Sequence, residues 1–117
     1  MIYTDPEIAF VGLTESAAKE AGYRVRCASV PYSANGRARA VSQTEGTMKI
    51  VADADTDRIL GVHIIGADAA ELIGEACAAL AFGATCEDLS LVCHAHPTFA
   101  ESLKECARAV RGEAINL

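Results

Sequence analysis

The residues from Gly46 to Gly66 carry the pattern that most restricts the fold. Met48, Ile50 and Ala52 alternate with Lys49, Val51 and Asp53, and the more apolar run Ile59–Ile65 follows an aspartate-rich turn. Alternation with period two is typical of a strand with one buried face, and two such runs around a short polar turn predict an antiparallel hairpin. The chain therefore needs a layer that covers this sheet.

Further strands and helices are predicted on both sides of the hairpin. Strands are expected at Glu7–Gly12 and Tyr23–Tyr32, and Pro31 places the second at an edge or at a strand end. Helices are expected from Thr14 to about Ala21, from Asp68 to Gly83, from Thr85 to about Val92, and from about Thr98 to Gly112. Asp68 with Glu71 has the spacing of a capping box. The polar connection Ser33–Ala40 has no pattern that fixes its form.

Strands come mainly before helices in this order, which favours an α+β fold with an antiparallel β-sheet covered by helices. In the last helix, Phe99, Leu103, Cys106, Ala107 and Val110 share one face, which is expected to pack on the sheet. No repeat or linker-like stretch interrupts the chain, so residues 1–117 are expected to form a single domain.

Charge and composition exclude several classes of function. The formal net charge is −6 and the chain has no basic cluster, which argues against a nucleic-acid partner or an anionic membrane surface. The longest uninterrupted apolar run, Ala76–Phe82, is far shorter than a membrane span, and the N-terminus lacks the layout of a signal peptide. Neither a dinucleotide-binding glycine motif nor a P-loop is present.

The chain has five cysteines, an odd number, and no C-x-x-C motif. This usage predicts reduced thiols of an intracellular protein, mostly buried on helix faces, and no redox pair. The five cysteines are Cys27, Cys77, Cys86, Cys93 and Cys106.

The segment from Cys93 to Glu101 holds the chemistry-bearing residues, because two of the three histidines lie there just before a helix. Three interpretations are open. Thr98 and Glu101 fit a capping box, in which case both histidines are solvated. Alternatively, Cys86, Cys93, His94 and His96 are metal ligands, although their spacing matches no zinc module, so no metal is expected. Finally, Glu101 can orient an upstream histidine as a general acid/base dyad.

The stretch from His94 to Glu101 resembles the H-A-H-P-T-x-x-E signature of the dihydrolipoamide dehydrogenases, a branch of the pyridine nucleotide-disulfide oxidoreductases. Tyr3–Glu15 resembles the start of that family's C-terminal domain, and Gly61–Gly66 with Ala70–Ile73 resembles its hairpin and following helix. H-P-T-x-x-E alone would also fit glutathione reductases, and His94-Ala95 favours the lipoamide branch. Phe99-Ala100 departs from the family's common residues at these positions.

The resemblance implies an interface domain that forms a homodimer. It assigns the catalytic base to His96 and its orienting carboxylate to Glu101, both donated to the partner subunit's active site for the oxidation of dihydrolipoamide with FAD and NAD. His94, His96 and Pro97 would lie near the partner's FAD, and the His96–Pro97 peptide would be cis. The other expected partner is the lipoyl domain of a 2-oxoacid dehydrogenase complex. The expected location is the bacterial cytoplasm or the mitochondrial matrix.

The flavin-binding and NAD-binding parts of that family, with its redox C-x-x-x-x-C motif, have no counterpart in this sequence. We therefore expect a piece of a longer protein, inactive alone, with Met1 an added start residue, and we expect it to self-associate through an apolar surface. Two alternatives stay open: the interface domain of another disulfide reductase, such as a glutathione-reductase-like enzyme, and a free-standing dimerisation module whose histidine and glutamate only cap a helix.

Overall fold

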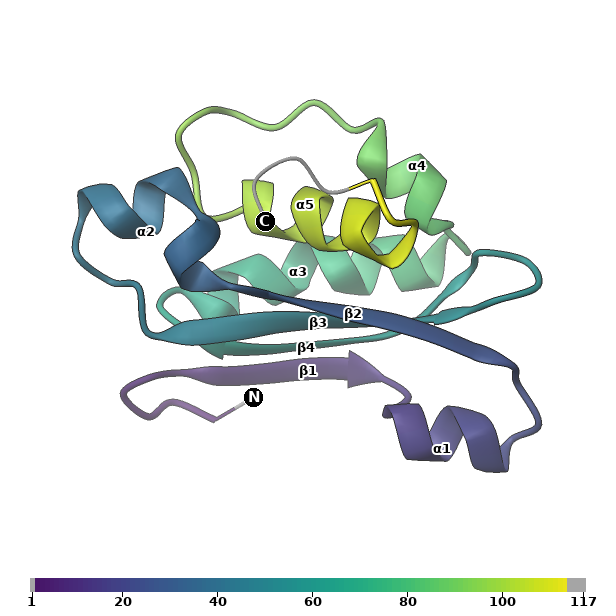
Figure 1. Ribbon diagram of the computed structural model, residues 1–117. Coiled ribbons are helices and arrows are strands. Elements are labelled where there is room, and N and C mark those ends of the chain that lie inside the picture. Colours follow the sequence, from purple (N-terminus) through teal and green to yellow (C-terminus); the bar gives the residue numbers. More distant parts are fainter. Residues whose placement is uncertain (1, 114–117) are drawn as a thin grey trace.

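A computed structural model describes residues 2–113, in which four strands form one antiparallel sheet (Figure 1). The strands are β1 (Ile8–Gly12), β2 (Val25–Pro31), β3 (Gly46–Asp53) and β4 (Ile59–Gly66). Their order across the sheet is β1-β4-β3-β2. The predicted hairpin is therefore the central pair β3–β4, and β2 is an edge strand, as Pro31 indicated.

Most of the helices lie on one face of this sheet. The helices are α1 (Glu15–Glu20), α2 (Gly36–Ala40), α3 (Ala69–Ala81), α4 (Cys86–Ser90) and α5 (Glu101–Val110), with a 3-10 turn η1 (Tyr32–Ala34) before α2. Helix α3 packs on β1 and β4, and α5 packs on β2 and β3. Figure 1 shows α3, α4 and α5 on the same side of the sheet and α1 on the other side of it. The α+β class with a helix-covered antiparallel sheet is confirmed.

The main core lies between the sheet and helices α3 and α5. Alternate residues Met48 and Ile50 of β3 are fully buried, as the period-two pattern predicted. The predicted inner face of α5 is also buried, at Leu103, Cys106, Ala107 and Val110. Each large apolar side chain buried in this way stabilises the fold by roughly 1.5–3 kcal/mol. These buried side chains hold α5 against the sheet along the length of the helix.

Two local predictions differ from the structure. Asp68 precedes α3, but its backbone is left-handed (φ 60°) and its side chain makes no capping bond. The carboxylate of Glu7, which is distant in sequence, instead accepts a hydrogen bond from the Ala70 N–H at 3.0 Å. The connection from Ser33 to Ala40 forms η1 and α2, and Asn35 caps α2 by accepting from the Ala38 N–H at 2.9 Å.

Among the helices of residues 2–113, none has the length and apolar character that a membrane crossing would need.

Candidate active site

His96 and Glu101 form a hydrogen-bonded pair at the start of α5. The Nδ1 atom of His96 lies 2.9 Å from Oε1 and 3.0 Å from Oε2 of Glu101. The His96 side chain is 76% exposed, whereas that of Glu101 is 33% exposed. The carboxylate is thus partly shielded at the helix entrance and the ring extends from it into solvent.

Glu101 also holds the turn that carries the histidine. Its Oε1 atom accepts a hydrogen bond from the Thr98 N–H at 3.0 Å, which is one half of the expected capping box. The other half is absent, because α5 begins at Glu101 with Ala100 as its N-cap and not near Thr98 as predicted. The Thr98 hydroxyl donates to the Ala95 carbonyl at 2.7 Å. Oε1 therefore serves the backbone and the ring together, while Oε2 serves the ring alone.

The carboxylate stays ionised in this setting. Partial burial raises the pKa of Glu101, but the Thr98 N–H and the His96 ring together outweigh it and hold the pKa below its usual range. An ionised carboxylate only accepts hydrogen bonds, so Nδ1 of His96 must carry a proton. In the neutral ring, the lone pair is then on Nε2.

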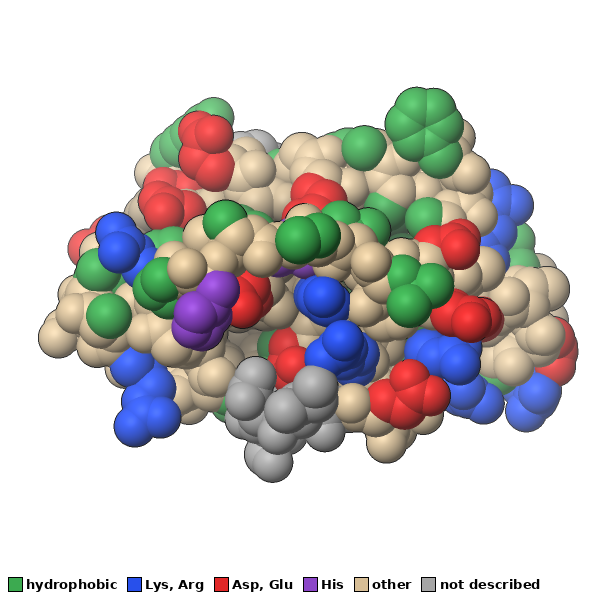
Figure 2. Space-filling model, turned by 90° about the horizontal axis from the view of Figure 1, so that it is seen from above, with side chains coloured by type: hydrophobic (Ala, Val, Ile, Leu, Met, Phe, Trp, Pro, Cys, Tyr) green, Lys and Arg blue, Asp and Glu red, His purple; other side chains and the backbone are tan. Residues whose placement is uncertain are grey.

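The Nε2 atom of His96 has no hydrogen-bond partner within residues 2–113. Figure 2 shows a histidine side chain that projects from the helix-covered side of the molecule beside an acidic one. A shallow cavity of about 220 Å³ adjoins the pair and is lined by both residues and by Asn35 and Arg39. The arrangement is that of an oriented base which can take a proton from outside the chain.

A second anchor, which the sequence analysis missed, holds this turn from α2. The buried Asn35 side chain donates from Nδ2 to the Thr98 carbonyl at 2.9 Å. Next to Thr98, the Phe99 ring packs on the buried Tyr32 ring with centroids 5.8 Å apart. The Phe99 departure from the family pattern is therefore accommodated by an aromatic contact, and the pair of His96 and Glu101 remains intact.

His94 has a different environment from His96. Its side chain is only 7% exposed, and Nε2 lies 2.7 Å from Oε2 of Glu75 on α3. Its Nδ1 lies 3.2 Å from the Val92 carbonyl. The expectation that both histidines are solvated if Glu101 caps the helix is wrong for His94. Sequence spacing gave no sign of Glu75, which comes from another helix.

The segment that contains both histidines is otherwise open to solvent. The His96–Pro97 peptide is cis, as the resemblance implied. Cys93, Ala95, His96 and Pro97 are exposed. The N–H groups of residues 93–96 donate to no backbone carbonyl in the part of the chain that the structure describes. They are available to acceptors on another molecule.

The cysteines are unpaired, but fewer are buried than expected. Cys86 and Cys106 are buried, Cys27 is half-buried, and Cys77 and Cys93 are exposed. Burial raises the pKa of the Cys86 and Cys106 thiols to about 12, which makes them poor nucleophiles. Across residues 2–113, no three His, Cys, Asp or Glu side chains are placed to share a metal ion.

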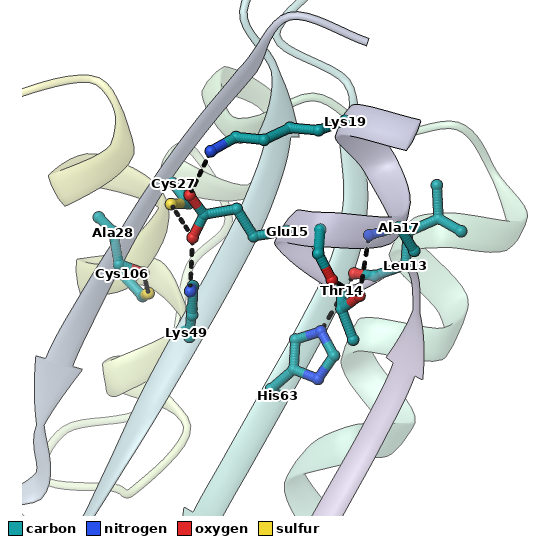
Figure 3. A network of polar contacts seen from close by, with 11 residues as sticks. Leu13, Thr14, Glu15, Ala17, Lys19, Cys27, Ala28, Lys49, His63 and Cys106 are labelled. Atoms are coloured by element: carbon teal, nitrogen blue, oxygen red, sulfur yellow. Dashed lines mark hydrogen bonds and ion pairs between the residues drawn. The ribbon is translucent and has the colours of Figure 1, made fainter. Parts of the chain in front are cut away.

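A separate polar network joins α1 to the sheet (Figure 3). Glu15 accepts hydrogen bonds from Lys49 at 2.9 Å and Lys19 at 3.1 Å, and the Cys27 thiol donates to it at 3.4 Å. The hydrogen bond from Lys49, followed by those from Lys19 and Cys27, lowers the pKa of Glu15 to about 2. Burial and the neighbouring carboxylate raise the pKa of Cys27. This network fixes α1 and leaves the thiol protonated.

Comparison with known proteins agrees with this architecture. Residues 1–107 match the family described as the pyridine nucleotide-disulphide oxidoreductase, dimerisation domain. The mitochondrial dihydrolipoyl dehydrogenase of Schizosaccharomyces pombe is 52% identical over 109 residues, which are 93% of this chain and 21% of that protein. The dihydrolipoyl dehydrogenase of Thermus scotoductus is 50% identical over the whole chain and 25% of its own length.

Comparison with solved structures leads to the same assignment. The HOCl-induced flavoprotein disulfide reductase RclA of Escherichia coli, in its Cu(II) complex, superposes with a TM-score of 0.87 at 30% identity, over 92% of this chain and 24% of RclA. LpdA of Mycobacterium tuberculosis superposes with a TM-score of 0.85 at 28% identity, over 92% of this chain and 24% of LpdA. The chain thus spans about a quarter of the length of these proteins. It belongs to the pyridine nucleotide-disulphide oxidoreductase family and is a dimerisation domain of the dihydrolipoyl dehydrogenase type.

Proposed function

We propose that this domain supplies His96 and Glu101 as an acid/base dyad to the active site of a partner subunit in a homodimeric dihydrolipoyl dehydrogenase. The observation that carries the proposal is the exposed ring of His96, which Glu101 orients through Nδ1 and whose Nε2 has no hydrogen-bond partner in residues 2–113. A base needs a proton donor within hydrogen-bond reach. The donor must therefore come from another chain or another domain.

The thiol of dihydrolipoamide is a suitable donor. His96 would take its proton on Nε2, which converts the thiol to the thiolate that attacks a disulfide. Glu101 would stabilise the imidazolium that results and keep the ring in the same orientation. The same ring would then return the proton as the reaction proceeds. When bound, FAD and NAD accept the electrons that leave the reduced disulfide.

The residues present fit a flavin placed outside this chain better than one held by it. The chain has no glycine-rich nucleotide motif of its own. It offers instead an exposed segment whose N–H groups, at residues 93–96, lack backbone acceptors among the described residues. Backbone at His94, His96 and Pro97 would border a flavin held by the partner subunit.

An exposed apolar surface supports the dimer. Phe82 at the end of α3 is 89% exposed, and Leu91 and Val92 beyond α4 are 75% and 42% exposed. Large exposed apolar side chains close together mark interaction surfaces. Leu91 and Val92 begin the segment that leads to His96, which supports an interface that continues along this segment toward the proposed catalytic base. The second proposed partner, the lipoyl domain, would bring the substrate to this composite site. The relatives include mitochondrial and bacterial enzymes, and we propose the mitochondrial matrix or the bacterial cytoplasm as the location.

Steady-state kinetics of the full-length oxidoreductase that carries this domain test the proposal. We expect His96→Gln to lower turnover by about 10²–10⁴-fold, which is the usual effect of losing a general acid/base. Glu101→Gln is expected to cost less, because the base remains with a less stabilised imidazolium. The comparison variant is His94→Gln, which changes a histidine two residues away and should cost less than His96→Gln, because His94 is not the group that takes the proton. If His94→Gln were the more damaging change at equal folding and FAD content, the base would be assigned to the wrong residue.

A further inference from the structure

The buried ring of His94 has an acceptor oxygen at each of its two nitrogens. Nδ1 faces the Val92 carbonyl at 3.2 Å, and Nε2 faces the Glu75 carboxylate at 2.7 Å. A carbonyl oxygen can only accept, and so can an ionised carboxylate. Both ring nitrogens must then donate, which a neutral imidazole cannot do because it carries a single N–H.

The proton that satisfies both contacts has two possible positions. It is either on the ring, giving an imidazolium beside a carboxylate, or on Glu75, which then donates to a neutral ring. The distance of 2.7 Å between Nε2 and the carboxylate oxygen is that of a charge-assisted hydrogen bond, which favours the proton on the ring. The ion pair is also shielded, because the His94 side chain is 7% exposed and that of Glu75 is 31% exposed. Attraction between the charges is less screened there than in open solvent.

We propose that Glu75 and the Val92 carbonyl hold His94 as an imidazolium, which ties the segment carrying His96 to helix α3 and so positions the base. His94 is a positioning residue. Its ring is enclosed and has an acceptor at each nitrogen, whereas the His96 ring is exposed and, among the described residues, has an acceptor at Nδ1 alone. This inference deepens the proposed function and rests on it for the role of His96, although the charge state of His94 stands independently.

The groups that face His94 come from three elements. Glu75 lies on α3, the Val92 carbonyl lies in the connecting segment, and Glu101 lies on α5. Partial burial raises the pKa of Glu101, while the Thr98 N–H, His96 and, least of these, His94 lower it. A cationic His94 therefore also helps to keep the Glu101 carboxylate ionised.

Loss of one proton would set a lone pair of the ring against an oxygen. If Nε2 keeps its proton for Glu75, the Nδ1 lone pair faces the Val92 carbonyl oxygen at 3.2 Å, and in the other tautomer the Nε2 lone pair faces the carboxylate oxygen at 2.7 Å. Both contacts are repulsive. Glu75→Gln removes this requirement, because the amide can donate to a neutral ring. Glu75→Ala removes the contact with α3 altogether. The two variants therefore separate the charge of His94 from its attachment.

Nitrogen-15 NMR of the histidine rings in this 117-residue chain tests the inference, and only His63, His94 and His96 contribute signals. At neutral pH we expect both nitrogens of His94 to be protonated, and we expect His96 to carry a proton on Nδ1, beside Glu101. In Glu75→Gln, His94 is expected to lose its second proton while His96 keeps its Nδ1–H signal. In Glu75→Ala, the His96 Nδ1–H signal should weaken through faster exchange. Glu71→Gln, on the same helix, is the control and should change neither ring.

An unprotonated nitrogen on His94 in the unmodified chain would overturn the assigned charge. This result needs no variant, so it is decisive even if Glu75→Ala fails to fold. An unaltered His96 signal in folded Glu75→Ala would overturn the positioning role. Neither result would alter the proposed function, which fails instead if His96→Gln leaves turnover of the full-length oxidoreductase unchanged.

Discussion

Replacement of Asn35 by alanine is expected to destabilise the domain because this one side chain makes two contacts. Its Oδ1 accepts from the Ala38 N–H at the start of α2, and its Nδ2 donates to the Thr98 carbonyl, both at 2.9 Å. Loss of a helix cap costs about 1 kcal/mol. Loss of the second bond, which leaves a partly buried carbonyl unpaired, costs about 1–2 kcal/mol more. The expected decrease in unfolding free energy is thus about 2–3 kcal/mol.

Urea unfolding at fixed protein concentration measures this decrease directly, and a thermal scan should show a fall in Tm of roughly 10 °C for a domain of this length. Asn35→Ser is the matched control. Serine keeps a capping oxygen for Ala38 but is too short to reach Thr98, so it should lose about half as much stability. An Asn35→Ala variant within about 0.5 kcal/mol of the unmodified domain, a typical neutral surface change, would refute the reasoning.

Two further predictions concern the accessibility of the thiols and the stability of the domain in acid. In the native domain a thiol reagent should modify the exposed Cys77 and Cys93 first, and it should reach the buried Cys86 and Cys106 only on unfolding. The unfolded chain should titrate five free thiols without reductant. A native Cys86–Cys93 disulfide would contradict this prediction. Because the pKa of Glu15 is lowered from its ordinary 4.5 to about 2, its contribution to stability is present above about pH 4.5 and is lost as the pH falls toward 2. Unfolding of Glu15→Gln should therefore differ from that of the unmodified domain at pH 6 and converge with it near pH 2, and a constant difference would refute the assignment.

Much of the fold could be predicted because its signals are local. The hairpin follows from alternation in β3, and the buried face of α5 follows from helical spacing. The pair of His96 and Glu101 is also local, since the two residues are five positions apart. Short-range spacing of this kind is what sequence patterns record.

The remaining features depend on contacts between distant residues. Asn35 reaches Thr98 across 63 residues, and Glu75 reaches His94 across 19. The capping box expected at Asp68 was wrong because Glu7, 63 residues before Ala70, supplies the cap. No periodicity encodes such pairs, because tertiary packing alone brings them together. The sequence therefore predicted the pairing of His96 with Glu101, while the side chains that hold this pair in place became visible only in the structure.

The central claim is that His96 acts in the active site of the partner subunit, and mixed dimers of the full-length oxidoreductase test it most directly. One subunit carries His96→Gln, and the other has serine in place of one cysteine of the redox disulfide. Each variant alone should be nearly inactive. If His96 acts across the dimer, the mixed dimer has one complete site of two and turnover returns. If the mixed dimer, with FAD bound, is no more active than either parent variant, His96 acts within its own subunit or not at all, and the account is contradicted.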